Sequence, residues 1–241
     1  MSLYSDISRM QPNAADVLEG TPLFAGLNPE QRREIGTRLK RRSFAPGVTL
    51  FHQDMLGNSL YLIEAGRVRV LILGRTGIEI TLNVLGPGDV FGELSLLDNK
   101  PHSATALTIE PCVVWLLARA DMEEFIECYP ALARALLGIL VGRVRAVTHL
   151  IEAMAFQDVQ GRLAYRILFL AEHHGYLSPA GIEIAAPLTQ AELATMVGAS
   201  RESVNKALMA LRANELIRVE GSHITLINSE GLQKMIFDRG R

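Results

Sequence analysis

The chain has 241 residues, enough for two domains with separate cores, and its 49% apolar and 21% charged residues are typical of a globular protein. Its net charge of −2 excludes a protein that attracts nucleic acid through bulk positive charge. The longest nearly unbroken apolar run, residues 135–142, is far shorter than the ~20 residues of a membrane span, so no membrane partner is expected. Cys112 and Cys128 provide neither a disulfide framework nor a metal-binding spacing, which makes a reducing, cytoplasmic location the default expectation.

The N-terminal part is expected to begin with a loose arm over residues 1–20. Asn28 is suited to cap a helix that begins at Pro29 and runs to about residue 40. This helix would end in a basic cluster made of Arg38, Lys40, Arg41 and Arg42. Because cations are favoured at a helix C-terminus, we interpret the cluster as a solvated helix end.

From Ser43 onward, short runs of strand-forming residues are separated by glycine-containing turns. The predicted strands are residues 48–52, 59–65, 67–73, 78–84, 103–107 and 112–117. Short strands at nearly regular spacing indicate a β-sandwich or β-roll and not parallel βαβ units. After the last strand, Asp121 is expected to cap a short helix over residues 122–128.

One segment between these strands, residues 86–103, departs from the strand pattern. Residues 92–97 suit one or two turns of helix, whose exposed N–H groups would favour an anion. In this segment Glu93 could accept a hydrogen bond from a sugar hydroxyl, and Ser103 could donate one to a phosphate oxygen. These features are compatible with a small-molecule site, with an ordinary loop around Asp98 and Asn99 as the alternative.

A long helix is predicted over residues 130–154, since Pro130 suits a helix start and no later proline interrupts the segment. Its apolar residues recur with a period of 3.5, interrupted once by Arg143. The predicted seam consists of Leu136, Leu140, Val147, Leu150 and Met154. We interpret it as the stalk of a parallel dimer, with an ordinary core helix as the alternative.

The C-terminal part carries the pattern of a helix-turn-helix. Thr189 and Glu192 form a capping box at the start of a short helix, Gly198 lies at the tight turn, and Ser200 caps a second helix. The inward-facing positions of the second helix are Val204, Ala207, Leu208 and Leu211. The two following runs, residues 216–219 and 223–227 around Gly221, are predicted to form a two-stranded wing.

The first turn of the second helix favours DNA recognition over a purely structural helix pair. Arg201 could donate two hydrogen bonds to a guanine edge, and Glu202 could accept one from cytosine. Residues 156–241 contain as many Lys and Arg as Asp and Glu, so binding would depend on local placement and on the two half-sites of a dimer. The candidate DNA-binding residues are Thr189, Gln190, Ser200, Arg201, Glu202, Asn205 and Lys206.

Three strings in the sequence resemble the Crp/Fnr superfamily of bacterial transcription regulators. They are GPGDVFGELSLLDNKPHSAT, FQDVQGRLAYRIL and LTQAELATMVGASRESVNKALMALRANELI. The resemblance implies an α+β fold with a cyclic-nucleotide-binding β-roll (residues 21–129), a dimerisation helix (130–155) and a winged helix-turn-helix (156–241), behind the N-terminal arm (1–20). It also implies a homodimer, a palindromic double-stranded DNA site and RNA polymerase as a partner.

The resemblance carries over unevenly to individual residues. Arg201 and Glu202 match the base-reading pair of the family, whereas Lys206 replaces an arginine. The implied effector-binding residues are Gly92, Glu93, Leu94, His102, Ser103, Arg143 and Thr148. His102 stands where cyclic-AMP binders carry a phosphate-binding arginine, and Val147 replaces a threonine next to Thr148. The effector therefore stays open between a cyclic nucleotide, another ligand and none.

Other classes fit the sequence less well. An iron–sulfur regulator needs four cysteine ligands, and the chain has two. His52, His102 and His149 leave haem open, although each is expected to be an ordinary histidine. A metal enzyme needs clustered ligands, and no nucleophile–base pair is evident, so we expect neither a metal site nor catalytic residues. A nucleotide-binding module without DNA binding is disfavoured by the second domain.

Overall fold

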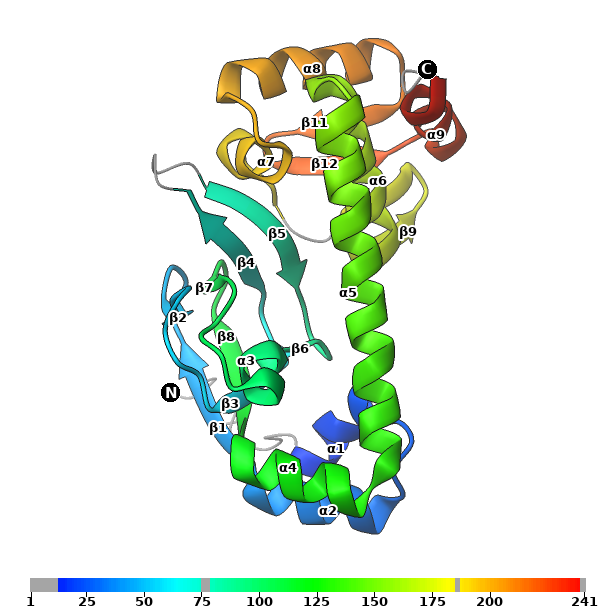
Figure 1. Ribbon diagram of the computed structural model, residues 1–241. Coiled ribbons are helices and arrows are strands. Elements are labelled where there is room, and N and C mark those ends of the chain that lie inside the picture. The colour runs from blue at the N-terminus through cyan, green and yellow to red at the C-terminus, as the bar shows by residue number, and fades with distance from the viewer. Residues whose placement is uncertain (1–12, 75–78, 185–186, 239–241) are drawn as a thin grey trace, which may run out of the picture. The chain divides into compact units, whose positions relative to one another are not determined.

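The computed structural model describes residues 13–74, 79–184 and 187–238, without the side chains of Met154, His173, Phe237 and Asp238. The described residues divide into two compact units (Figure 1). The first unit consists of the described residues within Met1–Val70 and Asn83–Arg143. The second unit consists of those within Leu71–Leu82 and Val144–Arg241.

Antiparallel strands form the centre of the first unit, and residues 71–73 and 79–82 of two of these strands belong to the second unit. One four-stranded sheet has the order β1-β8-β3-β6, and a second has the order β2-β7-β4-β5. The strands are β1 (Lys40–Phe44), β2 (Thr49–Phe51), β3 (Ser59–Ala65), β4 (Val68–Leu73), β5 (Glu79–Leu85), β6 (Val90–Phe91), β7 (Thr105–Thr108) and β8 (Cys112–Ala118). Side chains of both sheets share a buried cluster that includes Ile63, Val68, Ala106 and Val114. The predicted β-roll is thus confirmed.

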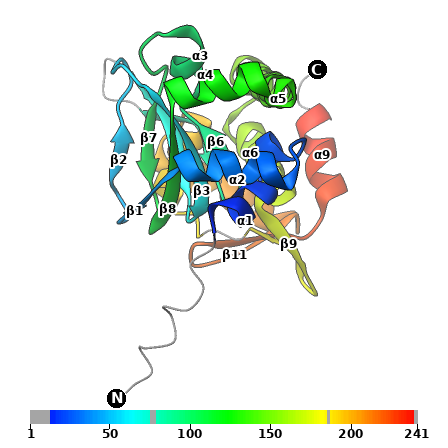
Figure 2. The ribbon, with the colours of Figure 1, turned by 90° about the horizontal axis from the view of Figure 1, so that it is seen from below.

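Helices cover the other face of the first sheet (Figure 2). They are α1 (Ala14–Glu19), the short 3₁₀ helix η2 (Pro22–Phe24), α2 (Pro29–Arg38), α4 (Arg119–Cys128) and the start of α5. Their apolar faces bury Leu18, Phe24 and Phe125 against Leu60 and Leu117 of the sheet. Asn28 forms the expected cap of α2, with its side chain accepting from the N–H of Gln31 at 2.9 Å.

The long helix α5 (Pro130–Phe156) confirms the helix predicted over this segment. Asp158 then caps the next helix by accepting a hydrogen bond from the N–H of Gly161 at 2.8 Å. Across the described residues, no single helix meets the length and hydropathy needed to cross a membrane, while one bent pair, Arg119–Cys128 with Pro130–Ala153, meets them jointly at an angle of 113°.

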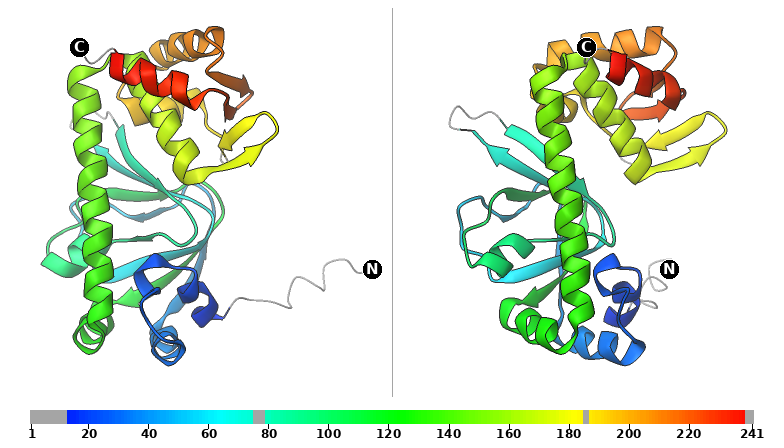
Figure 3. Two further views of the ribbon diagram at one scale, coloured as in Figure 1. Left: turned by 90° about the vertical axis from the view of Figure 1, so that its right-hand side faces the viewer. Right: turned by 45° about the vertical axis from the view of Figure 1, so that its right-hand side comes forward.

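The second unit contains a winged helix (Figure 3). Its helices are α6 (Val159–His174), α7 (Gln190–Val197), α8 (Arg201–Ala213) and α9 (Ser229–Asp238). Strands β9 (Gly175–Ser178), β10 (Gly181–Ile184), β11 (Ile217–Glu220) and β12 (His223–Leu226) form one sheet in the order β11-β12-β10-β9. The predicted wing is therefore present, and β10 pairs with its strand β12. Helices α6 and α8 pack on this sheet, and Leu163, Ile167, Leu208 and Ile224 are buried.

Several local predictions were wrong. Helix α2 ends at Arg38, and the basic residues from Lys40 onward belong to strand β1, which pairs with β8. Asp121 lies in the first turn of α4, whose N-cap position is Ala118. Part of the expected N-terminal arm is helix α1, because Ala14 and Leu18 are buried; residues 1–12 lie outside the described residues.

Candidate functional sites

The turn between α7 and α8 follows from local hydrogen bonds. The N–H of Glu192 donates to the Thr189 hydroxyl at 3.2 Å, and the Glu192 carboxylate accepts from the N–H of Thr189 at 2.7 Å. Gly198 adopts a left-handed conformation with φ +60°, which a residue with a side chain rarely adopts. Ser200 then starts α8 by accepting from the N–H of Ser203 at 3.1 Å. The predicted helix-turn-helix is confirmed.

A row of polar side chains is exposed at the start of α8. Arg201, Glu202, Asn205 and Lys206 are exposed, and the opposite face buries Val204 and its neighbours. Gln190 of α7 connects two members of the row, because its side chain accepts from Arg201 Nε at 3.5 Å and donates to Asn205 at 3.4 Å. Such a helix start presents an arginine and an amide to base edges, and its N–H groups suit a phosphate.

The effector-site residues of the first unit gather around the short helix α3 (Glu93–Asp98). Gly92 precedes it with φ +81°, and a Cβ there would lie 3.0 Å from the carbonyl oxygen of Ser59. Glu93 is only 1% exposed, and its Oε1 accepts a hydrogen bond from Arg143 of α5, which also donates to the carbonyl oxygen of Val90. Glu93 Oε2 is buried and has no hydrogen-bond partner among the described residues. This oxygen could accept a hydrogen bond from a ligand.

His102 lies in an aromatic environment inside the roll. It is 5% exposed, its ring stacks on Phe51 with 3.7 Å between centroids, and its Nδ1 lies 3.1 Å from the Ser95 hydroxyl. Its Nε2 approaches Gly57 so closely that a Cβ at that glycine would lie 2.2 Å away. Burial lowers the pKa of His102, so the ring is neutral near pH 7. The histidine therefore does not supply the charge that an arginine would supply.

The remaining predicted effector residues differ in position. Leu94 lies in the first turn of α3 and Ser103 lies between α3 and β7, and both residues are exposed. The Thr148 hydroxyl donates to the carbonyl oxygen of Val144 in its own helix at 2.9 Å. Thr148 belongs to the second unit, whereas Gly92, Glu93, His102, Ser103 and Arg143 belong to the first.

Sequence reasoning missed Arg119, at the start of α4. Its guanidinium donates to the carbonyl oxygens of Gly57 at 2.6 Å and Ser95 at 2.7 Å, and to the side chain of Asn99 at 2.8 Å. Arg119 thereby fixes both α3 and the loop that covers His102. The sequence held no local signal for this role, because the three acceptors lie about 20 to 60 residues away along the chain.

The surface of α5 differs from the predicted seam. Leu136 is 3% exposed and belongs to the core of the first unit, Leu140 and Leu150 are partly buried, and Val147 is exposed. A second row of apolar residues with a 3.5-residue spacing is exposed, and each of its positions follows a position of the predicted seam by one residue. We call them the α5 stripe: Leu137, Val141, Val144 and Ile151, with Thr148 at the intervening position.

Metal ligands are not clustered in the described part of the chain, where no group of three or more His, Cys, Asp or Glu side chains could hold an ion. Of the three histidines considered for haem, His52 is exposed, His102 is packed on Phe51, and His149 lies 3.2 Å from Glu152.

A winged helix with an exposed polar recognition row, together with a β-roll that holds a buried carboxylate, defines a DNA-binding transcriptional regulator with an effector-sensing domain. Residues 41–129 match the cyclic nucleotide-binding domain family, and residues 161–235 match the Crp-like helix-turn-helix domain.

Known proteins support the same class over nearly the whole chain. The CRP-like cAMP-activated global transcriptional regulator of Mycobacterium tuberculosis is 33% identical over 91% of this chain and 98% of its own length. The Cyclic AMP receptor protein of Thermus thermophilus is 32% identical over 91% of this chain and 99% of its own length. The chain belongs to the Crp/Fnr family of transcriptional regulators, whose members are not enzymes.

Solved structures agree with this assignment. The structure of the Thermus thermophilus Catabolite Activator Protein is 32% identical in sequence and has a TM-score of 0.52. The match covers 90% of this chain and 99% of the Catabolite Activator Protein chain. A CooA mutant from Carboxydothermus hydrogenoformans, at 21% identity, covers 94% of this chain and 97% of its own, with a TM-score of 0.74, and supports the fold alone.

Proposed function

We propose that the protein is a cytoplasmic homodimer that binds a two-fold symmetric DNA site through α8 and acts on transcription together with RNA polymerase. Residues 21–129 form the effector domain in this proposal, residues 130–155 the dimerisation helix, and residues 156–241 the DNA-binding domain. The supporting observation is the exposed polar row at the start of α8, in which Gln190 contacts both Arg201 and Asn205.

The members of this row have different roles in the proposal. Arg201 reads guanine with two parallel donors, and Glu202 accepts from cytosine. Lys206 lies 2.8 Å from the Glu202 carboxylate in an exposed ion pair, so it contributes charge without the fork of an arginine. Thr189 and Ser200 are at the N-terminal ends of α7 and α8, where hydroxyl and backbone N–H groups suit phosphate contacts.

A binding-site selection from random duplexes, followed by fluorescence anisotropy, tests this role. Arg201→Ala should weaken binding to the selected site by about 1–3 kcal/mol and relax the preference for guanine at one position in each half-site. Arg212→Ala is the matched control, because it removes the same charge from the last turn of α8 and should leave sequence preference unchanged. An Arg201→Ala variant with the wild-type ratio of specific to scrambled binding would exclude α8 as the reader.

For the effector, we propose a ligand of the cyclic nucleotide class that binds through a hydroxyl group. Its hydroxyl would donate to Glu93 Oε2, which is buried and has no hydrogen-bond partner in the part of the chain that the structure describes. Glu93 and Arg143 form an ion pair, and His102 is neutral, so these three groups carry no net positive charge toward a phosphate. Cyclic AMP should therefore bind roughly ten- to hundredfold more weakly than it binds a relative with an arginine at this position, because one charge-assisted hydrogen bond is lost.

A second candidate function is DNA binding that does not depend on a nucleotide. It is favoured by His102, which packs against Phe51 and Gly57 and offers a phosphate no positive charge near pH 7. Calorimetry with cyclic AMP at pH 6 and pH 8, combined with DNA binding in the absence of nucleotide, separates the two candidates. Weak binding of cyclic AMP in calorimetry, together with DNA binding that the nucleotide stimulates, supports the effector proposal. If cyclic AMP gives no heat of binding at either pH and the protein still binds DNA, the second candidate is supported. Tight binding of cyclic AMP at both pH values contradicts the role given to His102.

Dimerisation is proposed along the α5 stripe. Its exposed apolar side chains repeat with the spacing of a coiled-coil seam and are followed by an exposed Phe156 at the end of the helix. A partner helix would bury this apolar surface, which a monomer leaves in water. Leu140, Val147 and Leu150 would then flank the contact, and Leu136 would support it from the core.

A further inference from the structure

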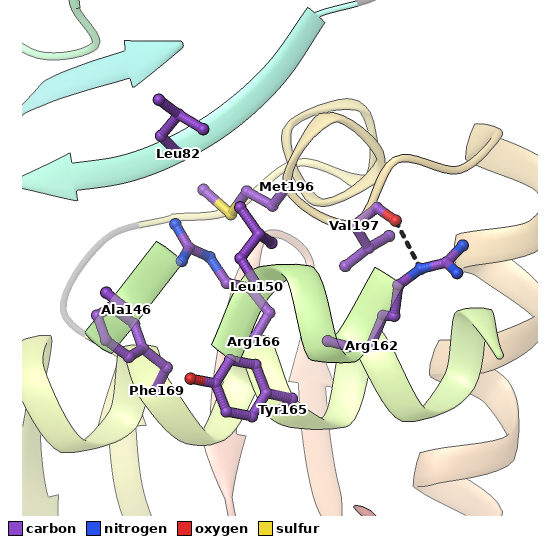
Figure 4. Close-up of a pocket in the computed structure, with 10 residues that line it drawn as sticks. Leu82, Ala146, Leu150, Arg162, Tyr165, Arg166, Phe169, Met196 and Val197 are labelled. Atoms are coloured by element: carbon purple, nitrogen blue, oxygen red, sulfur yellow. Dashed lines mark hydrogen bonds between the residues drawn. The ribbon is translucent and has the colours of Figure 1, made fainter. Parts of the chain in front are cut away.

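A small cavity lies inside the second unit, among residues that have no part in the proposed DNA and effector sites. Its volume is about 20 Å³. Figure 4 shows the side chains around it, which come from β5, the C-terminal half of α5, α6 and α7. Its walls include Leu82, Ala146, Leu150, Arg166, Phe169 and Met196.

Arg166 of α6 is the polar group of this cavity. It is 7% exposed, and its Nε and Nη2 atoms are buried and have no hydrogen-bond partner among the described residues. In Figure 4 its guanidinium points toward the side of the cavity formed by Met196 and β5. Its central carbon lies 5.2 Å from the centre of the Phe169 ring, a contact that compensates only part of a full charge.

Arg162, the other cation at the cavity, already has hydrogen-bond partners for two of its nitrogen atoms. Its Nε donates to the carbonyl oxygen of Val197 at 2.8 Å, and its Nη1 donates to that of Gln157 at 3.0 Å. Figure 4 shows the first of these bonds and the Arg162 guanidinium turned away from Arg166. Among the described residues that line the cavity, the buried donors without a hydrogen-bond partner are therefore those of Arg166.

The charge on Arg166 persists in this environment. Burial lowers the pKa of Arg166 to about 10, so the guanidinium is still protonated near pH 7. None of the ten residues that line the cavity is acidic. A buried charge is costly without a counter-charge, and two unsatisfied N–H donors add to that cost.

We propose that this cavity is a binding site for one small inorganic anion of the size of chloride, held by Nε and Nη2 of Arg166. A volume of about 20 Å³ accommodates one species of roughly the size of water and excludes a nucleotide. A water molecule would satisfy a donor but leave the charge uncompensated, whereas a halide does both. The apolar walls formed by Leu82, Leu150 and Met196 suit a weakly hydrated monovalent ion better than a multiply charged one.

Occupation of the site would stabilise the second unit, because every residue that lines the cavity belongs to that unit. An anion that binds the folded state and not the unfolded chain raises stability with a saturable dependence on its concentration. This behaviour differs from general salt screening, which weakens exposed ion pairs without saturation at a site.

The test uses the full-length protein in sodium gluconate, with chloride replacing gluconate at constant ionic strength. The melting temperature of the wild type should rise and reach a plateau with chloride, and bromide should act in the same way. Arg166→Met should lose the chloride-dependent rise. Arg145→Met is the matched control, since it removes the same charge from an exposed position on α5 and should retain the rise.

A second variant keeps the test decisive if Arg166→Met does not fold. Ala146→Leu fills the cavity and retains Arg166, so it should also lose the chloride-dependent rise. Crystals grown in sodium bromide should give an anomalous peak beside Arg166 Nε. A melting temperature of the wild type that does not respond to the exchange of gluconate for chloride, or a response that persists in Ala146→Leu, overturns the proposal.

Discussion

Glu93, the first residue of α3, and Arg143, in the middle of α5, form an ion pair in which the carboxylate is 1% exposed and the guanidinium side chain is 30% exposed. Arg143 interrupts the apolar pattern of α5 because it reaches a buried carboxylate. The pair joins α3 and α5 within the first unit.

Loss of Arg143 should therefore destabilise the first unit. Arg143→Met leaves Glu93 buried without its partner, and we expect a loss of about 3 kcal/mol, the lower end of the range for a broken buried pair, because Arg143 is partly exposed. Urea unfolding followed by circular dichroism measures the change. Arg134→Met, at an exposed position of the same helix, should change stability by less than about 0.5 kcal/mol. Equal effects of the two variants would contradict the prediction.

The burial of His102 predicts that the free energy of unfolding depends on pH. Burial lowers its pKa in the folded state, so below its unfolded pKa of about 6.5 the unfolded chain binds a proton that the folded chain does not. Its contribution to stability is present above pH 6.5 and is lost as the pH falls from there toward the lower folded pKa. His102→Asn should flatten the curve of unfolding free energy against pH in this window. His149→Asn, at an exposed histidine, should retain the wild-type curve.

Gly57 should tolerate no side chain. A Cβ would lie 2.2 Å from His102 Nε2 and 2.7 Å from the Ser95 hydroxyl, so Gly57→Ala must displace the stacked histidine. Overpacking of this kind costs about 1–3 kcal/mol, which chemical denaturation would detect. Gly20→Ala is the control, because the nearest atom to its Cβ would be 3.9 Å away. If the two substitutions are equally tolerated, the loop does not hold His102 as described.

The α5 stripe predicts which substitutions separate the protomers. Val144→Asp combined with Ile151→Asp places charges at two exposed apolar positions, so the protein should become monomeric while its melting curve keeps a cooperative transition. Light scattering measures the mass, and anisotropy should show the loss of tight binding to a two-fold symmetric duplex. Arg145→Asp, which lies beside the stripe at an exposed position, is the control and should stay dimeric. A double variant with the mass of a dimer would exclude the stripe as the interface.

The sequence predicted those features that depend on local signals. The capping box at Thr189, the left-handed Gly198 and the cap at Ser200 each depend on residues a few positions apart. The bounds of the helix-turn-helix could therefore be predicted from the sequence. Strand β1 was missed because its basic residues give a weak strand pattern, and its partner β8 lies about 70 residues later in the chain.

The α5 seam shows a different limit of the sequence. Two adjacent rows of a helix can both carry apolar residues at a 3.5-residue spacing, and only the packing of Leu136 on the core distinguishes the inner row from the outer one. Similarly, the sequence identified His102 as a replacement for arginine, but its neutral state depends on Phe51 and Gly57, which are distant along the chain.

The three hydrogen bonds of Arg119 have a consequence for how the effector site opens. Its guanidinium fastens the loop at Gly57 and helix α3 at Ser95 and Asn99 to the start of α4. Neither the loop nor α3 can move away without breaking bonds to the same side chain, so both should open as one cooperative unit. In native-state hydrogen exchange, the amides of these two segments should then share one opening free energy, and Arg119→Met should separate them into two classes with different exchange rates.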